Sequence, residues 1–257
     1  DVLNFLAYDV WVPGNHDFEW GVARLRALIG RFHGQTPAAN WDGAPAVARF
    51  ERAGLRIAVI GLTSEMLDWY LRLPDGMPRF SGEKSALKRA MAEVRRQPCD
   101  VIILAVHRGI YAIQGDRLDV LIADYPEIDL VVGGHSHVVN PGESVKGIHF
   151  TAPGSHGAGL SRIELDIPAA GESGERRIAS EFIPVTPQTA PLTALVRAVE
   201  RNYRPEDGTA VAGRTKPAAA RAPKRRYASS FGTLALLGIT AELPGTVGLA
   251  GNSTAKK

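Results

Sequence analysis

The amino-acid sequence predicts a layered α/β fold, and two observations support this fold class. Apolar runs of strand length alternate with segments in which apolar residues recur every three or four positions, as in amphipathic helices. From residue 148 on, strand-like runs follow one another without helices between them, which predicts an antiparallel or mixed second sheet. With 257 residues, 45% of them apolar, the chain is long enough to bury a large core.

The expected elements follow the chain in order. The first half should hold strands that lead into helices: strand 8–12, helix 22–32, strand 55–62, helix 84–96, strand 101–106, helix 117–124 and strand 128–132. Ser81 and Glu83 mark the start of the helix 84–96. The run 101–106 is apolar at nearly every position, as expected of a buried strand. The second half should hold three strands joined by turns: 148–152, 161–167 and 177–185.

The chain is expected to divide into three parts. Residues 1–186 carry the pattern of strands and helices and form the main domain. Residues 187–203 predict a single amphipathic connector helix, since aliphatic side chains share one face. Residues 204–257 are rich in small residues, Pro, Lys and Arg, without a sustained period, so a flexible basic tail is expected.

The formal net charge of +3 is unevenly distributed. Residues 208–257 hold eight Lys or Arg against one acid, whereas the rest of the chain holds 22 bases against 26 acids. The positive excess therefore belongs to the tail, where the basic run 224–226 is expected to be solvated, and it gives no argument for specific nucleic-acid binding. No run of about 18 apolar residues predicts a membrane span. The single cysteine excludes an internal disulfide.

Three histidine-bearing motifs follow expected strands directly. They are Gly14-Asn15-His16-Asp17, His107-Arg108-Gly109 and Gly134-His135-Ser136-His137. In open α/β sheets the loops beyond the carboxyl ends of the strands meet in one crevice, so these side chains can come together although they lie far apart in sequence. Imidazole and carboxamide groups suit a divalent ion such as zinc, manganese or iron, and a catalytic site is the better interpretation.

Two alternatives remain open at this point. If the chain is extended at 135–137, His135 and His137 point the same way, whereas a turn there lets them reach two neighbouring ions. The first motif could also be an ordinary turn, in which His16 caps the next helix. His156 lies in another turn-rich segment, where a turn histidine without a role in the site is the favoured interpretation.

The motifs together resemble those of the calcineurin-like metallophosphoesterases, most closely the 5'-nucleotidase family. The resemblance rests on the order of the three motifs, on Phe18 and Trp20-Gly21 after the first, and on flanking residues: Leu3-Asn4-Phe5, Tyr8-Asp9, Pro13, Pro153-Gly154-Ser155, Gly159-Leu160 and Arg162. It covers residues 1 to about 186, and the following helix is similar to the interdomain connector of that family. The fold that it implies is two stacked mixed β-sheets flanked by helices, the αββα sandwich.

The resemblance also implies roles for individual residues. Asn15, His107 and His135 would bind one of two divalent metal ions (Zn, Mn, Fe or similar), and His137 would bind the other. His16 would lie beside the phosphate, where it stabilises charge or protonates the leaving oxygen, and Asp17 would orient it.

The function implied by the resemblance is metal-dependent hydrolysis of a small phosphoester, a nucleotide by family, of 5'-nucleotidase or cyclic-nucleotide phosphodiesterase type. The mechanism implied is in-line attack on phosphorus by a hydroxide that bridges two ions roughly 3.5 Å apart. A periplasmic or secreted protein is expected on the same ground.

The sequence departs from the family pattern at both ends. The family's Asp-x-His and Gly-Asp metal motifs would precede Asp1, and no candidate for its nucleoside-binding domain follows residue 203. We therefore expect a truncated chain with an incomplete second metal site. The alternative is a catalytically inactive remnant that serves as a binding or interaction module. Hydrolysis of thiosulfate-type esters is disfavoured because the first motif has the phosphatase form.

Overall fold

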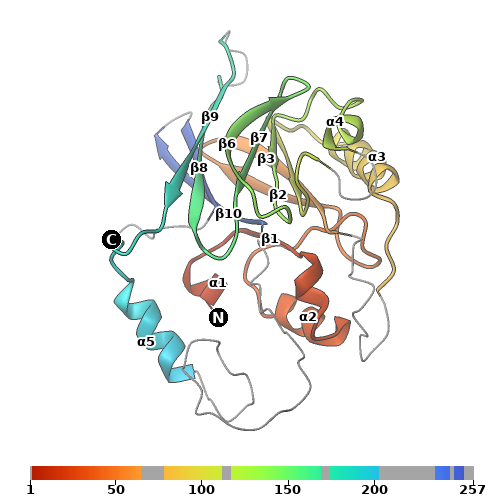
Figure 1. Ribbon diagram of the computed structural model, residues 1–257. Helices are drawn as coiled ribbons and strands as arrows, with labels where there is room; N and C mark the ends of the chain where they lie inside the picture. Colours follow the sequence, from red (N-terminus) through yellow and green to blue (C-terminus); the bar gives the residue numbers. More distant parts are fainter. Residues whose placement is uncertain are drawn as a thin grey trace.

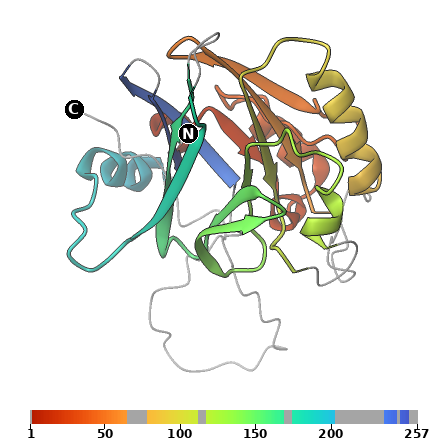
Figure 2. The same ribbon diagram turned by 90° about the horizontal axis from the view of Figure 1, so that it is seen from above.

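Two β-sheets packed face to face make up the centre of the computed structural model (Figure 1, Figure 2). The structure describes residues 2–64, 78–111, 117–168, 174–202, 235–243 and 246–251. The helices are α1 (Val2–Phe5), α2 (Val22–Ile29), α3 (Glu83–Val94), α4 (Leu118–Leu121) and α5 (Thr193–Asn202), with one 3-10 helix, η1 (Asn15–Phe18). This arrangement is the layered α/β fold expected from the sequence.

The first sheet is mixed. In spatial order its six strands are β2 (Val47–Arg52), β3 (Leu55–Leu62), β4 (Val101–Val106), β5 (Leu130–Val132), β7 (Ile148–Pro153) and β6 (Val139–Val145). The four central strands run parallel, and the two edge strands are antiparallel to their neighbours. The strand expected at 148–152 therefore lies in this sheet, beside β5, and not in the second sheet.

The second sheet pairs neighbouring strands antiparallel throughout. Its five strands, in spatial order, are β1 (Val10–Val12), β10 (Ala235–Leu243), β11 (Thr246–Gly251), β8 (Gly159–Asp166) and β9 (Arg177–Pro184). The expectation of a flexible tail is wrong for β10 and β11, which form a hairpin between β1 and β8. Gly and Thr interrupt the apolar alternation there and weaken the strand signal. The basic run 224–226 lies outside the described residues.

Successive residues of β3 pack alternately into two different hydrophobic cores, because this strand is buried on both faces. Ile57 and Val59 face the second sheet, where they pack with residues of β1 and β8. Ile60 and Leu62 face the other way, into a cluster that α3 and α4 complete. Each such side chain contributes about 1.5–3 kcal/mol when it is fully buried. The two cores hold the sheets and helices in fixed register, which fixes the positions of the loops at the strand ends.

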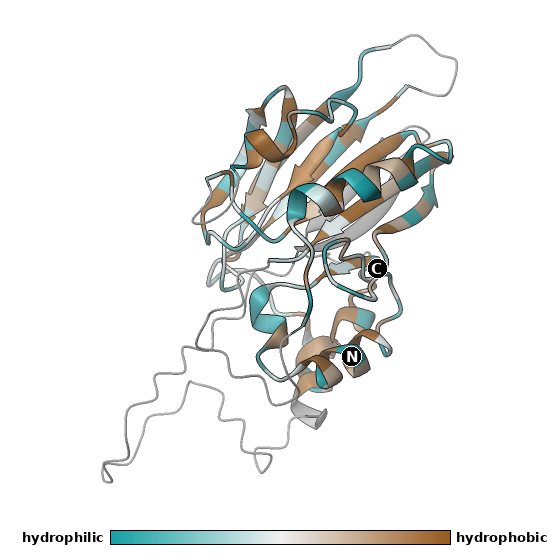
Figure 3. Ribbon diagram, turned by 90° about the vertical axis from the view of Figure 1, so that its right-hand side faces the viewer, coloured by the Kyte–Doolittle hydropathy of each residue, from teal (hydrophilic) through white to brown (hydrophobic). Residues whose placement is uncertain are grey.

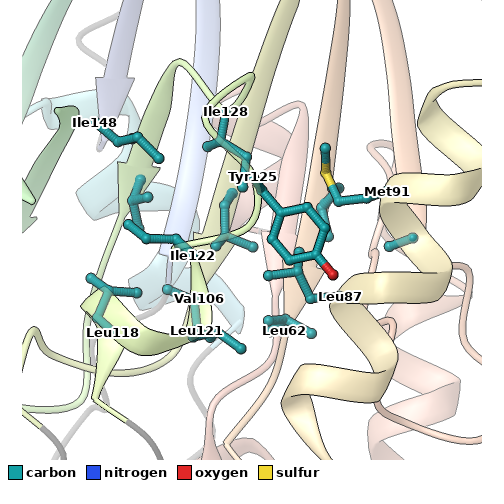
Figure 4. Close-up of a cluster of buried hydrophobic side chains, with 14 of the residues drawn as sticks. Leu62, Leu87, Met91, Val106, Leu118, Leu121, Ile122, Tyr125, Ile128 and Ile148 are labelled. Carbon is teal, nitrogen blue, oxygen red and sulfur yellow. The ribbon is translucent and has the colours of Figure 1, made fainter. Parts of the chain in front are cut away.

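Helix α3 shows how the outer layer is anchored. Leu87 and Met91 point from α3 towards the sheet, and Figure 4 shows them beside Leu62 and Tyr125. The opposite side of this helix carries hydrophilic residues, as Figure 3 shows where α3 lies in front of the strands. Burial on one side only is the amphipathic pattern that the sequence indicated for 84–96.

Every helix and strand expected before residue 203 is found, with shifts at the ends. The largest shift is in the connector helix, because α5 begins at Thr193 and not at 187. Pro191 disfavours helical geometry in the residue before it, which delays the start. Strand β2 was not foreseen; it pairs with β3 through a tight turn in which Ala53 and Gly54 both have positive φ. Within the described ranges, no helix is both long and apolar enough to cross a membrane.

Candidate metal centre

Three loops that leave strand ends meet at one edge of the two sheets. The β1 strand leads through Pro13 into η1, β4 leads directly into His107, and β5 leads into Gly133. Strands β4 and β5 are parallel neighbours, so the loops after them lie side by side. Strand β1 belongs to the other sheet, whose core side chains pack against those of β4 and β5. The first motif therefore faces the other two across the interface between the sheets.

Asn15, His107 and His135 converge in this interface, as expected from the sequence. The Oδ1 atom of Asn15 lies 2.9 Å from Nε2 of His107 and 3.3 Å from Nδ1 of His135. The ring centres of the two histidines are 5.1 Å apart. Asn15 and His107 are each only 2% exposed. Three potential ligand atoms, two nitrogens and one oxygen, thus point at one small, buried volume.

The two known separations among these three atoms fit a shared divalent ion. Ligand atoms about 2.0–2.1 Å from a tetrahedral ion lie roughly 3.3 Å from one another, and the two separations observed here are 2.9 and 3.3 Å. Neutral imidazole and a carboxamide oxygen are suitable ligands for zinc, manganese or iron. Within the part of the chain that the structure describes, no group of three His, Cys, Asp or Glu side chains is arranged to hold a metal. The third potential ligand beside the two histidines is thus the carboxamide of Asn15.

Gly14 allows the first motif to lie directly on the ring of His107. A Cβ atom at this position would be 2.5 Å from Cε1 of His107, well inside van der Waals contact. The backbone of Gly14 has an extended conformation, so the requirement for glycine comes from the close approach and not from φ. This contact places Asn15 within reach of both histidines.

The third motif forms a turn, which decides between the two alternatives for His135 and His137. Both residues have positive φ, 61° and 60°, and the N–H of Ser136 donates to the carbonyl of Gly134. The two side chains consequently diverge: His135 faces Asn15, whereas the ring of His137 packs edge-on against that of His156.

His16 is held by Glu19 and not by Asp17. Nδ1 of His16 is hydrogen-bonded to Oε1 of Glu19, three residues later, which directly follows η1. Asp17 instead accepts a 2.7 Å hydrogen bond from the N–H of Gly14 and so closes the turn that begins η1. Burial raises the pKa of Asp17 to about 6, with the Gly14 hydrogen bond acting in the opposite direction. The structure therefore differs from the expectation that Asp17 orients His16.

The family model described as calcineurin-like phosphoesterase matches residues 2–139, more than half of the chain. The chain belongs to the calcineurin-like phosphoesterase family. The match includes all three motifs and Glu19, whereas His156 lies beyond it. Members of this family generally use divalent metal ions.

Individual relatives of this calcineurin-like phosphoesterase are nucleotidases by name. It is 27% identical over 156 residues to a probable 5'-nucleotidase from Treponema pallidum, covering 56% of this chain and 25% of the relative. It is 30% identical over 156 residues to a 5'-nucleotidase from Vibrio cholerae, covering 52% and 27%. Among solved structures, the calcineurin-like phosphoesterase YfkN from Bacillus subtilis superposes with a TM-score of 0.67 at 18% identity, covering 78% of this chain and 71% of that one, which supports the fold. The chain thus spans about a quarter of the length of these curated relatives.

The side of the centre that carries His16, His137 and His156 is more open to solvent than the side formed by Asn15, His107 and His135. His137 and His156 are exposed, and His16 is partly exposed. Partial burial lowers the pKa of His137, and the neighbouring His156 and His16 act in the same direction. These three histidines therefore lie close enough for their charges to interact.

Arg108 ties the second motif to the helical layer. Its guanidinium forms an ion pair with Glu83, the first residue of α3, and the residue is 7% exposed. The carbonyl of Arg108 accepts a hydrogen bond from the N–H of Gly134. The loops that carry His107 and His135 are in this way linked to each other and to α3.

Two residues of the centre were missed by reasoning from the sequence. Glu19 could have been found from its spacing, because residues i and i+3 share one side of a short helix. His156 offered no such signal, since its contact with His137 depends on how two separate loops pack.

Proposed function

We propose that the chain is a metal-dependent phosphoester hydrolase that acts on nucleotides or similar small phosphates, of 5'-nucleotidase or cyclic-nucleotide phosphodiesterase type. The observation that carries this proposal is the convergence of Asn15, His107 and His135 on one buried volume in a member of the calcineurin-like phosphoesterase family. The names of the relatives favour nucleotides as the substrate class.

In this reaction different residues would bind the two metal ions. Asn15, His107 and His135 would hold one ion, and His137 would hold the other. When bound, such ions lower the pKa of a bound water and stabilise negative charge on the phosphoryl oxygens. The turn at 134–137 directs its two histidines to the two sides of the centre.

His16 is the group that handles the leaving oxygen. Because its Nδ1 is bonded to Glu19, the imidazole presents Nε2 towards a substrate. A carboxylate at Nδ1 orients the ring and fixes its tautomer. His16 can therefore donate a proton to the leaving oxygen or a hydrogen bond to the phosphoryl group.

The test is phosphate release by the full chain with Mn²⁺ or Zn²⁺ on p-nitrophenyl phosphate, bis-p-nitrophenyl phosphate and AMP. We expect His16→Ala to lower kcat by about 10²–10⁴-fold. Asn15→Ala should raise the metal concentration needed for activity. The matched control is His33→Ala, because His33 is exposed and adjoins Gly34, which contacts Asp9 at the opposite end of β1. Absence of hydrolysis of all three substrates would contradict the proposal.

A second candidate is an inactive member of the family that serves as a binding module. The observation in its favour is the partial ligand set, since within the described residues no group of three His, Cys, Asp or Glu holds a metal. Metal analysis of the purified chain separates the two candidates. Two ions per chain support the hydrolase, whereas a metal-free protein that also fails the hydrolysis assay supports the binding module.

A further inference from the structure

We propose that His156 is a metal ligand, which binds a divalent ion together with His137 on the exposed side of the centre. This inference rests on the proposed metal-dependent function and adds to it a residue that lies outside the segment matched by the family model. With this residue, the exposed side of the centre has two imidazole ligands, His137 and His156, in place of one.

The geometry of the two rings carries the inference. The ring centres of His137 and His156 are 5.4 Å apart, with an angle of 76° between the ring planes. The buried histidines His107 and His135 have nearly the same arrangement, 5.1 Å and 69°. Two imidazoles on one tetrahedral ion place their ring centres roughly 5 Å apart, because each centre lies about 3 Å from the metal. Both histidine pairs therefore have the spacing of ligands that share an ion.

Hydrogen bonding selects the ring nitrogen of His156 that can bind. Nδ1 of His156 lies 2.8 Å from Oγ of Ser155. When Nδ1 carries the proton and donates it to the hydroxyl, Nε2 has the lone pair that a metal requires. Histidine ligands in metal sites generally have such a partner on the other nitrogen, which fixes the tautomer and the ring orientation.

Sheet topology explains why two distant loops bring these rings together. Strands β5 and β7 are parallel neighbours, with Val132 opposite Thr151, so the loops after them leave the same edge of the sheet. His137 lies on the loop after β5, and His156 on the loop after β7. Both residues have positive φ, 60° and 57°, a conformation that L residues other than Asn, Asp and His seldom adopt.

The chemistry of the ligands predicts the type of ion. Two imidazoles favour zinc, cobalt, nickel or copper over magnesium and calcium, which require oxygen ligands. Both rings are exposed, so solvent can supply the remaining ligands. Ligation of this kind involves no change in oxidation state.

The experiment is a titration of the full 257-residue chain with Co²⁺, followed by the visible absorption of the bound ion and by calorimetry. Wild type is compared with His156→Ala, His156→Gln and His107→Ala, with His33→Ala as the matched control. We expect both His156 variants to lose at least about tenfold in affinity at one of two sites. His33→Ala should titrate like wild type. Thermal unfolding without metal should be the same for all histidine variants at exposed positions.

The outcomes separate this inference from the function on which it rests. If His107→Ala weakens cobalt binding and the His156 variants bind like wild type, the role of His156 is refuted and the proposed centre stands. If wild type binds no cobalt, the proposed metal centre fails, and the inference fails with it. Loss of the weaker, more accessible ion in both His156 variants supports the inference.

Discussion

At the scale of single residues, the chemistry of the centre depends on which carboxylate holds His16. Glu19 bonds to Nδ1 of the ring, whereas Asp17 is occupied by the backbone of Gly14. The two acids lie two positions apart and have different neighbours. One of them therefore holds the imidazole that we propose as catalytic, and the other closes the turn that presents it.

Substitution of the two acids should separate these roles. Glu19→Gln keeps the size of the side chain but replaces the carboxylate that holds Nδ1 of His16, so we expect kcat to fall about 10-fold or more with little change in KM. Steady-state kinetics measure kcat and KM separately.

Asp17→Asn serves as the comparison. Its amide oxygen can still accept the hydrogen bond from Gly14, so kcat should remain close to that of wild type. If Asp17→Asn lowers kcat and Glu19→Gln does not, the assignment of the two roles is wrong.

The sequence predicted which residues would come together at the centre, but it did not predict the hydrogen-bond and ring partners of His16 and His137. Asn15, His107 and His135 were found because strand ends in an α/β sheet share an edge, a property of topology that motif placement reveals. The partners of His16 and His137 depend on local backbone geometry: a single 3-10 turn for Glu19 and positive φ for His137. Neither feature leaves a periodic signal in the sequence.

At the scale of elements, the starts of β3 and β4 are joined by an ion pair. Arg56 on β3 donates to both carboxylate oxygens of Asp100, which precedes β4, and the Asp100 carboxylate also accepts from the N–H of Arg56. The hydrogen bonds from the Arg56 side chain are the main cause that lowers the pKa of Asp100 to about 2. Because the ordinary value is 3.8, the folded protein favours the ionised carboxylate.

This shift predicts how stability depends on pH. A depressed pKa in the folded state gives a contribution that is fully present above about pH 4 and is lost as the pH falls through about 2. We expect Asp100→Asn to lower the free energy of unfolding by about 1 kcal/mol or less at pH 6, since Arg56 is half-exposed. The deficit should shrink as the pH falls towards 2.5. Urea denaturation of both proteins at pH 6, 4 and 2.5 measures it, and a deficit that is constant with pH would contradict the prediction.

The elements that were missed share a physical reason. Strand β2 carries Arg49, Glu51 and Arg52, because it is an edge strand with one face open to solvent, and this reduces its apolar content. Strand β6 is mostly exposed for the same reason. A pattern of apolar residues reveals a strand only when the strand is buried, so the exposed edge strands gave no clear pattern. The buried strands β3 and β4 were predicted with the correct ends.

At the scale of the whole molecule, the hairpin of β10 and β11 lies between β1 and β8 in the five-stranded sheet. It pairs with β1 on one side, Val10 opposite Leu237, and with β8 on the other, Thr246 opposite Asp166. The paired residues lie 80 or more positions apart in sequence. Such non-local contacts cannot be read from a local pattern, which is why the hairpin was missed.

Removal of the hairpin should loosen the sheet. A chain that ends at residue 231 leaves β1 without its partner strand and one edge of β8 unpaired, so we expect a loss of several kcal/mol in stability, of the order seen for other large core losses. Amide hydrogen exchange should become faster at Val10 and Val12. A chain that ends at residue 251 is the matched control. Unchanged protection in the shorter chain would show that the hairpin does not hold β1.

Burial changes across the candidate metal centre, and under the proposed function this gradient sets the direction from which an ester would arrive. Asn15 and His107 are sealed between the two sheets, whereas His137 and His156 border open solvent. In the proposed reaction only the phosphoryl end of the substrate would pass inward, while the group that it is esterified to would stay outside. A centre that is open on this side would place few demands on the alcohol portion, so discrimination among esters would have to come from surfaces other than the ligand cluster itself.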